Sequence, residues 1–283
     1  MGEIRQSRSV RKSIQPNLRM QERDRWILEA LEKCRFLTTK QLARLFFGKS
    51  TSAANKRLRK LLDGGLINVW MRRLEDQNIY SLSAKGAGLC SSATHRAAVP
   101  RGLDQVEHVL LINDTRVEFS LSLEHLRGAL SWWRSDWELR VPGQPLIPDA
   151  MFGVWWPDQK ETTFLLEADN ATRSQRAFLE KLLRYLKGSM NEVVTHANFR
   201  GVLVVAQDQV WAERYRAVAV NAGVLLPVWF TQRSLLQRDF SGSIWRTPED
   251  DQCHSLRGIV FRPYGKEEIV CARPSLPMVF GNE

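Results

Sequence analysis

The sequence lacks any apolar run of the roughly 18 to 20 residues that a membrane span needs, and its first twenty residues lack the apolar segment of an export signal. It also has few cysteines, with no CxxC pair and no histidine at ligand spacing: Cys34, Cys90, Cys253 and Cys271. These absences argue against a membrane protein, a structural zinc site and a disulfide framework. We therefore expect a cytoplasmic protein with reduced thiols.

Acidic residues are scarce only in the first part of the chain. Residues 1–100 hold 20 Lys and Arg against 8 Asp and Glu, whereas the rest of the 283 residues holds 21 against 23. A basic front third predicts that contact with a polyanion belongs there. Ribosomal, membrane-surface or heparin-like partners would fit the charge as well as DNA does. The length and the 43% hydrophobic content suit two domains with proper cores.

Residues 1–20 are basic and almost without apolar side chains, which predicts a flexible arm. Apolar spacing then predicts three helices, the first from Gln21 to about Cys34, the second from Thr38 or Thr39 to Gly48, and the third from Ser50 or Thr51 to before Gly64. One side of the third helix is apolar, with Ala54, Leu58, Leu61 and Leu62. The opposite side carries residues suited to a DNA groove, because short polar side chains read bases and cations hold phosphates: Ser52, Asn55, Lys56, Arg59 and Lys60.

Two strand-like runs follow, at residues 66–70 and 78–82, and the segment between them contains Arg72 and Arg73. Three helices and a hairpin with a basic tip predict a winged helix-turn-helix over residues 21–98. The segments Thr-Thr-Lys-Gln-Leu-Ala and Tyr-Ser-Leu-Ser-Ala-Lys-Gly resemble that superfamily. The resemblance implies binding to double-stranded DNA through the polar side of the third helix and through Arg72 and Arg73. Some winged helices contact proteins instead, so a protein-docking module is an alternative.

The second domain is predicted over residues 99–240. A helix over 103–127 is apolar on more than one side, which indicates burial on two faces, between domains or in a homodimer. Strands at 132–139, 146–156 and 162–169, a helix at 174–187, a strand at 201–206, a helix at 211–222 and a strand at 224–230 follow. This order predicts an α/β fold, α+β over the whole chain, with one mixed sheet between helices. A C-terminal extension, 241–283, is expected to pack on this domain with a final hairpin.

Three carboxylates fall on the predicted hairpin of this domain. Glu167 and Asp169 are two residues apart on one strand, so they share a face, and the hairpin brings Asp149 beside Glu167. Convergent acidic oxygens suit Mg²⁺ or Mn²⁺, which could activate a water and stabilise charge on a phosphate. Acids at strand ends are often merely solvated, and that alternative stays open.

The pattern Pro148-Asp149 followed by Glu167-Ala168-Asp169 resembles the Pro-Asp…(Asp/Glu)-x-Lys signature of the restriction-endonuclease-like fold. Asp169 stands where that signature usually has lysine. Lys181 and Tyr185 resemble a helix motif, Gln-x-x-x-Tyr, of recombination-type nucleases. The resemblance implies Asp149, Glu167 and Asp169 as metal ligands of a possible endonuclease, with Lys181 as their catalytic partner. Arg173 and Arg176, near the start of the helix, could contact phosphate.

Taken together, the two predicted domains resemble the replication-relaxation family of plasmids and mobile elements, over about residues 20–235. The resemblance is most specific in Ile-Pro-Asp-Ala, Phe-Leu-Leu-Glu-Ala-Asp-Asn-Ala-Thr and Glu-Lys-Leu-Leu-Arg-Tyr. It implies a DNA-binding protein acting in replication, relaxation, transfer or transcriptional regulation. Its expected partners are duplex DNA, a second copy of the chain and other replication or transfer proteins, at the nucleoid or on a plasmid. A Mg²⁺-dependent endonuclease targeted by its winged helix is the main alternative.

Overall fold

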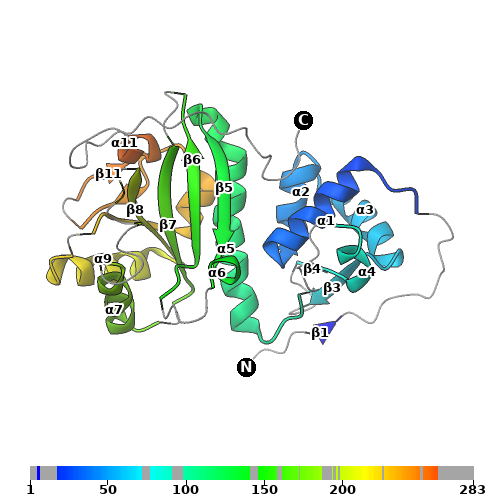
Figure 1. The fold of residues 1–283 in the computed structure, drawn as a ribbon, viewed down its shortest axis with the longest axis horizontal. Coiled ribbons are helices and arrows are strands. Elements are labelled where there is room, and N and C mark those ends of the chain that lie inside the picture. The colour runs from blue at the N-terminus through cyan, green and yellow to red at the C-terminus, as the bar shows by residue number, and fades with distance from the viewer. Residues whose placement is uncertain are drawn as a thin grey trace. The chain divides into compact units, whose positions relative to one another are not determined.

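The computed structural model describes residues 5–6, 18–71, 77–90, 98–140, 146–157, 161–171, 173–186, 193, 196, 198–224, 226–248 and 251–260. The chain forms two compact units, and the division falls between Asn113 and Asp114. Both residues belong to one helix, α5 (Leu103–Ser122) (Figure 1). The predicted domain boundary at residues 98–99 lies just before this helix.

The first unit contains three helices followed by a hairpin. The helices are α1 (Glu22–Cys34), α2 (Thr39–Phe46) and α3 (Thr51–Asp63), and the hairpin strands are β3 (Ile67–Met71) and β4 (Ile79–Leu82). Two short strands, β1 (Arg5–Gln6) and β2 (Leu37–Thr38), complete an antiparallel sheet in the order β1-β3-β4-β2. A turn of helix, α4 (Ala84–Ala87), follows β4. The helices and the hairpin occur where periodicity and turn residues predict them.

Local side chains explain where these helices begin and end. The Thr38 hydroxyl accepts a hydrogen bond from the backbone N–H of Gln41, whose side chain accepts from the N–H of Thr38 in return. Ser50 accepts from the N–H of Ala53 at the start of α3. Each such cap is worth about 1 kcal/mol. After α2, Gly48 takes a φ of +55°, a left-handed conformation that glycine adopts without strain.

Helix α5 contributes to both units. In the first, Val106, Val109 and Leu110 join a buried cluster with Phe36 and Ile79. In the second, the ring of Phe119 meets that of Phe152 edge-on, with centroids 4.8 Å apart. All residues from 109 to 119 are buried, and a 3₁₀ turn (Leu123–Leu126) ends the helical stretch. Burial within the chain thus accounts for the two-sided apolar pattern of α5. The predicted homodimer is therefore no longer supported by that pattern and stays a prediction.

One seven-stranded sheet organises the second unit. Its strands are β5 (Ala129–Ser135), β6 (Ala150–Trp155), β7 (Glu161–Asp169), β8 (Phe199–Ala206), β9 (Val228–Gln232), β10 (Trp245–Arg246) and β11 (Cys253–His254). They lie in the order β11-β10-β9-β8-β7-β6-β5. The three strands β7, β8 and β9 run parallel, and the neighbouring pairs on both sides are antiparallel. The mixed sheet and its helices confirm the predicted α/β class.

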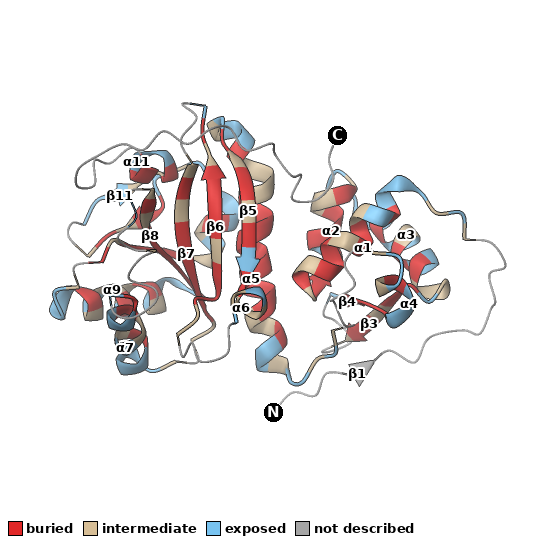
Figure 2. Ribbon diagram, in the orientation of Figure 1, coloured by how far each residue is buried: buried red, intermediate tan, exposed pale blue. Residues whose placement is uncertain are grey.

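Helices cover both faces of this sheet (Figure 1). On one face, α7 (Gln175–Tyr185) and α9 (Gln209–Asn221) bury Phe178 and Tyr215 against Leu165 of β7. On the other face α5 packs through Phe119, and Arg233 at the start of α10 (Arg233–Arg238) places its Nε 2.7 Å from Asp114 Oδ2 of α5. A last helix, α11 (Leu256–Val260), follows β11. Figure 2 shows the central strands almost wholly buried.

Three predicted elements of this unit need correction. The strand predicted over 132–139 ends at Ser135, and α6 (Asp136–Leu139) follows, because the backbone N–H of Ser135 donates to Glu138 Oε2 at 2.8 Å and begins a helical turn there. The strand predicted from 224 starts only at Val228. The C-terminal hairpin, β10 and β11, extends the sheet beside β9 instead of packing on it.

Within the described part of the chain, none of the helices has both the length and the apolar character needed to cross a bilayer.

Candidate functional sites

Alternation along β7 sets the first candidate site. Leu165 belongs to the apolar cluster beneath α7 and α9, so Glu167 and Asp169 share that face, while Phe164 stacks on Phe152 on the other. The backbone N–H of Asp149, just before β6, donates to Leu166 O at 3.0 Å. With Ala150 opposite Leu166 in the register, Asp149 lies opposite Glu167. The antiparallel hairpin therefore brings these two carboxylates together.

Glu167 is the centre of this cluster and is only 1% exposed. Its Oε2 lies 2.6 Å from Lys181 Nζ and 3.0 Å from Arg173 Nη1. The Tyr185 hydroxyl donates to its other oxygen, Oε1. Lys181 and Tyr185 are four residues apart on α7, so they present the same face of that helix to the sheet. The predicted partner of the carboxylates, Lys181, is thus in contact with one of them.

Asp149 completes the cluster. Its Oδ2 accepts a hydrogen bond from the backbone N–H of Ala168 at 2.9 Å. Its Oδ1 lies 3.4 Å from Arg173 Nη2 and 3.5 Å from Lys181 Nζ. Every carboxylate oxygen of Asp149 and Glu167 therefore accepts from a group of the chain.

Asp169, the third predicted carboxylate, has a different role in the structure. Its Oδ1 accepts from the backbone N–H of Ala171 at 2.6 Å, and Ala171 has a left-handed φ of 63°. This turn links β7 to Ser174, whose hydroxyl caps α7 by accepting from the N–H of Ala177. Arg173 lies between the turn and the cap. Asp169 thus shapes the connection that carries Arg173.

Arg173 is the residue whose role sequence analysis misses. We expected it to contact phosphate, but it pairs with Glu167 and Asp149. Arg176, assigned the same role, lies exposed on α7 beside Glu180. The useful signal in the sequence is an arginine in the short connection between a strand that ends in acids and a capped helix.

Burial dominates the electrostatics of this cluster. It raises the pKa of Glu167; Lys181 and Arg173 oppose that rise and Asp149 adds to it. Burial tends to lower the pKa of Arg173, but Asp149 and Glu167 outweigh it and the pKa is raised. Burial and the nearby Glu167 also raise the pKa of Tyr185. Arg173 therefore stays cationic and Tyr185 stays a neutral hydrogen-bond donor across the physiological range.

This donor set does not fit a bound Mg²⁺ or Mn²⁺. Such an ion needs several oxygen ligands with free lone pairs and an excess of negative charge. Here the oxygens of Asp149 and Glu167 already accept hydrogen bonds from the chain, and two cations, Lys181 and Arg173, lie against them. Among the residues that the structure describes, no group of three or more His, Cys, Asp or Glu side chains is placed to hold a metal ion. The metal role of Asp149, Glu167 and Asp169, and catalysis by Lys181, remain predictions.

The second candidate site is the outer face of α3. Its inner face buries Ala54, Leu58 and Leu61, as the apolar spacing predicts, whereas Leu62 is only half-buried. The predicted DNA-binding residues on the opposite face are all exposed: Ser52, Asn55, Lys56, Arg59 and Lys60. The polar stripe is therefore exposed along the length of the helix.

A groove of about 480 Å³ runs between α3 and the hairpin. Asn55 and Arg59 border it on the helix side, and Asn78 and Tyr80 border it on the β4 side. Its apolar lining comes from Leu62, Val69 and Met71. Arg59 also pairs with Asp63, one turn further along α3, at 3.1 Å. The predicted contacts Arg72 and Arg73 lie outside the described residues.

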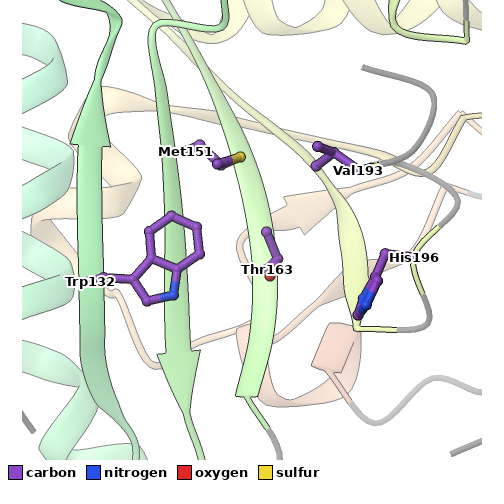
Figure 3. A pocket seen from close by; sticks show the side chains of 5 residues that line it. All are labelled: Trp132, Met151, Thr163, Val193 and His196. Atoms are coloured by element: carbon purple, nitrogen blue, oxygen red, sulfur yellow. The ribbon is translucent and has the colours of Figure 1, made fainter. Parts of the chain in front are cut away.

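A separate cavity of about 310 Å³ lies on the large sheet, bordered by Trp132, Met151, Thr163, Val193 and His196 (Figure 3). Trp132 donates its indole N–H to Glu161 Oε1 at 2.8 Å. Its ring lies so close over Gly153 that a Cβ there would come within 2.2 Å of Nε1. Thr163 and Glu167 point to the same face of the sheet, because they are four residues apart on β7 and side chains alternate along a strand. The cavity is mostly apolar and is distinct from the carboxylate cluster.

The fold and these sites define an α/β protein that joins a three-helix unit with an exposed polar helix to a mixed-sheet unit with a buried acid–base cluster. The sequence model of the replication-relaxation family matches residues 28–198, which include α3 and the cluster. The chain belongs to the replication-relaxation family, and membership suggests a role in the replication or relaxation of a plasmid or another mobile element. Comparisons with curated proteins and with solved structures returned no match.

Proposed function

We propose that this protein binds duplex DNA of a plasmid or other mobile element and acts in its replication or relaxation. Residues 21–98 serve in this proposal as a winged helix-turn-helix, with α3 as the helix that enters the major groove. The observation that carries the proposal is the polar face of α3, whose five members are all exposed. Family membership supplies the process.

The order of side chains along α3 suits a groove-binding helix. Ser52 and Asn55 are near its N-terminal end, where short polar side chains can reach the edges of bases. Lys56 and Lys60 lie on the same exposed face and can hold phosphates. The surplus of 20 Lys and Arg over 8 Asp and Glu in residues 1–100 adds attraction for a polyanion.

The test compares the affinities of variants for plasmid DNA by electrophoretic mobility shift. Asn55→Ala combined with Arg59→Ala should weaken binding at least tenfold, since a good base contact is worth about 1–3 kcal/mol. Arg176→Ala with Asn221→Ala is the matched control, because it removes the same residue types from exposed positions of the second unit. An unchanged affinity in a correctly folded α3 variant would show that α3 is not the DNA-binding helix.

A metal-dependent endonuclease is the second candidate. It is favoured by the contacts of Lys181, on α7, with Asp149 and Glu167 on the sheet face that α7 covers. It is disfavoured because Arg173 and Lys181 hold the carboxylate oxygens that an ion would need. We expect the wild-type protein and Asp149→Ala to nick supercoiled plasmid equally, at background level, with Mg²⁺ or Mn²⁺. Nicking that Asp149→Ala abolishes would establish the enzyme.

A further inference from the structure

The buried cluster has a cation already built into it. Arg173 reaches Glu167 Oε2 with Nη1, at 3.0 Å, and Asp149 Oδ1 with Nη2, at 3.4 Å. One guanidinium therefore bridges the two carboxylates through separate nitrogens. Lys181 Nζ contacts the same two oxygens from α7, at 2.6 Å and 3.5 Å. Two positive groups therefore lie against these two carboxylates, and the charge of the nearby Asp169 also acts on Arg173.

The backbone around Arg173 holds this arrangement in place. The turn at Ala171 is closed by the Asp169 carboxylate, and the Ser174 cap fixes the start of α7. The Tyr215 hydroxyl donates to the backbone carbonyl of Arg173 at 3.3 Å. A guanidinium tethered in this way is present beside the carboxylates at any concentration of free metal ion, and it does not lose its proton at physiological pH.

We propose that Arg173 is a resident counter-cation that takes the place of a divalent ion between Asp149 and Glu167, and that removing its guanidinium turns this pair into a Mg²⁺- or Mn²⁺-binding site. The cluster then holds the start of β6, the end of β7 and helix α7 together without metal. This inference concerns the second unit and does not rest on DNA binding by α3.

The experiment titrates the full chain with Mn²⁺ and follows the free ion by electron paramagnetic resonance. The wild type and Arg176→Gln should bind no Mn²⁺ at a site that Asp149→Asn would remove. Arg176→Gln is the matched control because it removes an exposed arginine three residues further along, paired only one turn away with Glu180. Arg173→Gln should bind one Mn²⁺ per chain, and adding Asp149→Asn should abolish that site.

Thermal unfolding gives a second measurement. Arg173→Gln should melt below the wild type without Mn²⁺, and its Tm should rise by about 5 °C or more when the ion saturates the new site. Arg173→Gln could be unfolded without the ion. In that case a cooperative unfolding transition that returns with Mn²⁺ supports the proposal, and a transition that does not return overturns it.

Two further results would overturn the proposal. One is a single Mn²⁺ site in the wild type that Asp149→Asn removes, and the other is an Arg173→Gln chain that binds no Mn²⁺.

Discussion

Lys181 sets how costly it is to keep Glu167 charged inside the protein. The Lys181 side chain is 15% exposed and that of Glu167 is 1% exposed, so solvent screens the pair little. We predict that Lys181→Met lowers the free energy of unfolding by about 2 kcal/mol at pH 8, because Glu167 loses its shortest charged contact and keeps only Arg173 as a cationic partner. Urea denaturation followed by tryptophan fluorescence measures the loss, with Arg184→Met on the exposed side of α7 as control.

The loss should depend on pH in a definite direction. Burial raises the pKa of Glu167 above its ordinary value of 4.5, so between that value and the raised folded pKa the folded state holds a proton that the unfolded state releases. The stability from that proton is full at low pH and is lost as pH rises through the folded pKa. Removing Lys181 raises the folded pKa further. Lys181→Met should therefore approach the wild type toward pH 5; an equal loss at pH 5 and pH 8 would contradict this.

The residue types of the cluster were predictable, but their partners were only partly so. The four-residue spacing of Lys181 and Tyr185 predicts a shared helix face, and both side chains reach Glu167. The period of two along β7 also predicts the common face of Glu167 and Asp169. The direction of Arg173 depends on the left-handed turn at Ala171, and alanine gives no sign in the sequence of adopting that conformation.

At the scale of single elements, α5 is tied to the end of α1 by one buried amide. Asn113 Nδ2 donates to the carbonyls of Cys34, at 2.9 Å, and Phe36, at 2.7 Å, and Asn113 is fully buried. We predict that Asn113→Ala lowers the free energy of unfolding by about 2 kcal/mol, since buried carbonyls lose their donor. Chemical denaturation of the full chain measures it. Ser120→Ala on the same helix should cost much less, because among the described residues the Ser120 hydroxyl donates to Arg116 O of its own helix. Similar losses for the two variants would refute the role of Asn113.

Elements were predicted well where one signal dominated and poorly where two competed. The caps Thr38 and Ser50 mark α2 and α3 correctly. For β5, the apolar run continues through Trp137, but Ser135 and Glu138 form a capping box that ends the strand. For β9, the apolar residues before Val228 include Pro227, which has no N–H to donate to a sheet ladder. In both cases a backbone hydrogen-bonding requirement overrides the hydrophobic pattern.

At the scale of the whole molecule, charge is divided between the two parts of the chain. Residues 1–100 hold 20 Lys and Arg against 8 Asp and Glu, and the remainder holds 21 against 23. The proposed binding to DNA through the first part would release condensed counterions, so the logarithm of the affinity should fall linearly with the logarithm of salt concentration, by about 0.9 for each phosphate contacted. A protein-docking module with no DNA contact would lack this dependence.

Two substitutions on α3 separate contacts to phosphate from contacts to bases. Lys60→Gln should reduce the steepness of the salt dependence by about 1 and weaken binding similarly for all DNA sequences, because it removes one phosphate contact. Asn55→Ala should weaken binding only to the preferred sequence and leave the steepness unchanged, because an amide displaces no counterion. Fluorescence anisotropy with labelled duplexes at 50 to 200 mM salt measures both. Equal slopes for Lys60→Gln and the wild type would mean that this lysine faces solvent in the complex, and α3 would then lie in the groove by a different face or not at all.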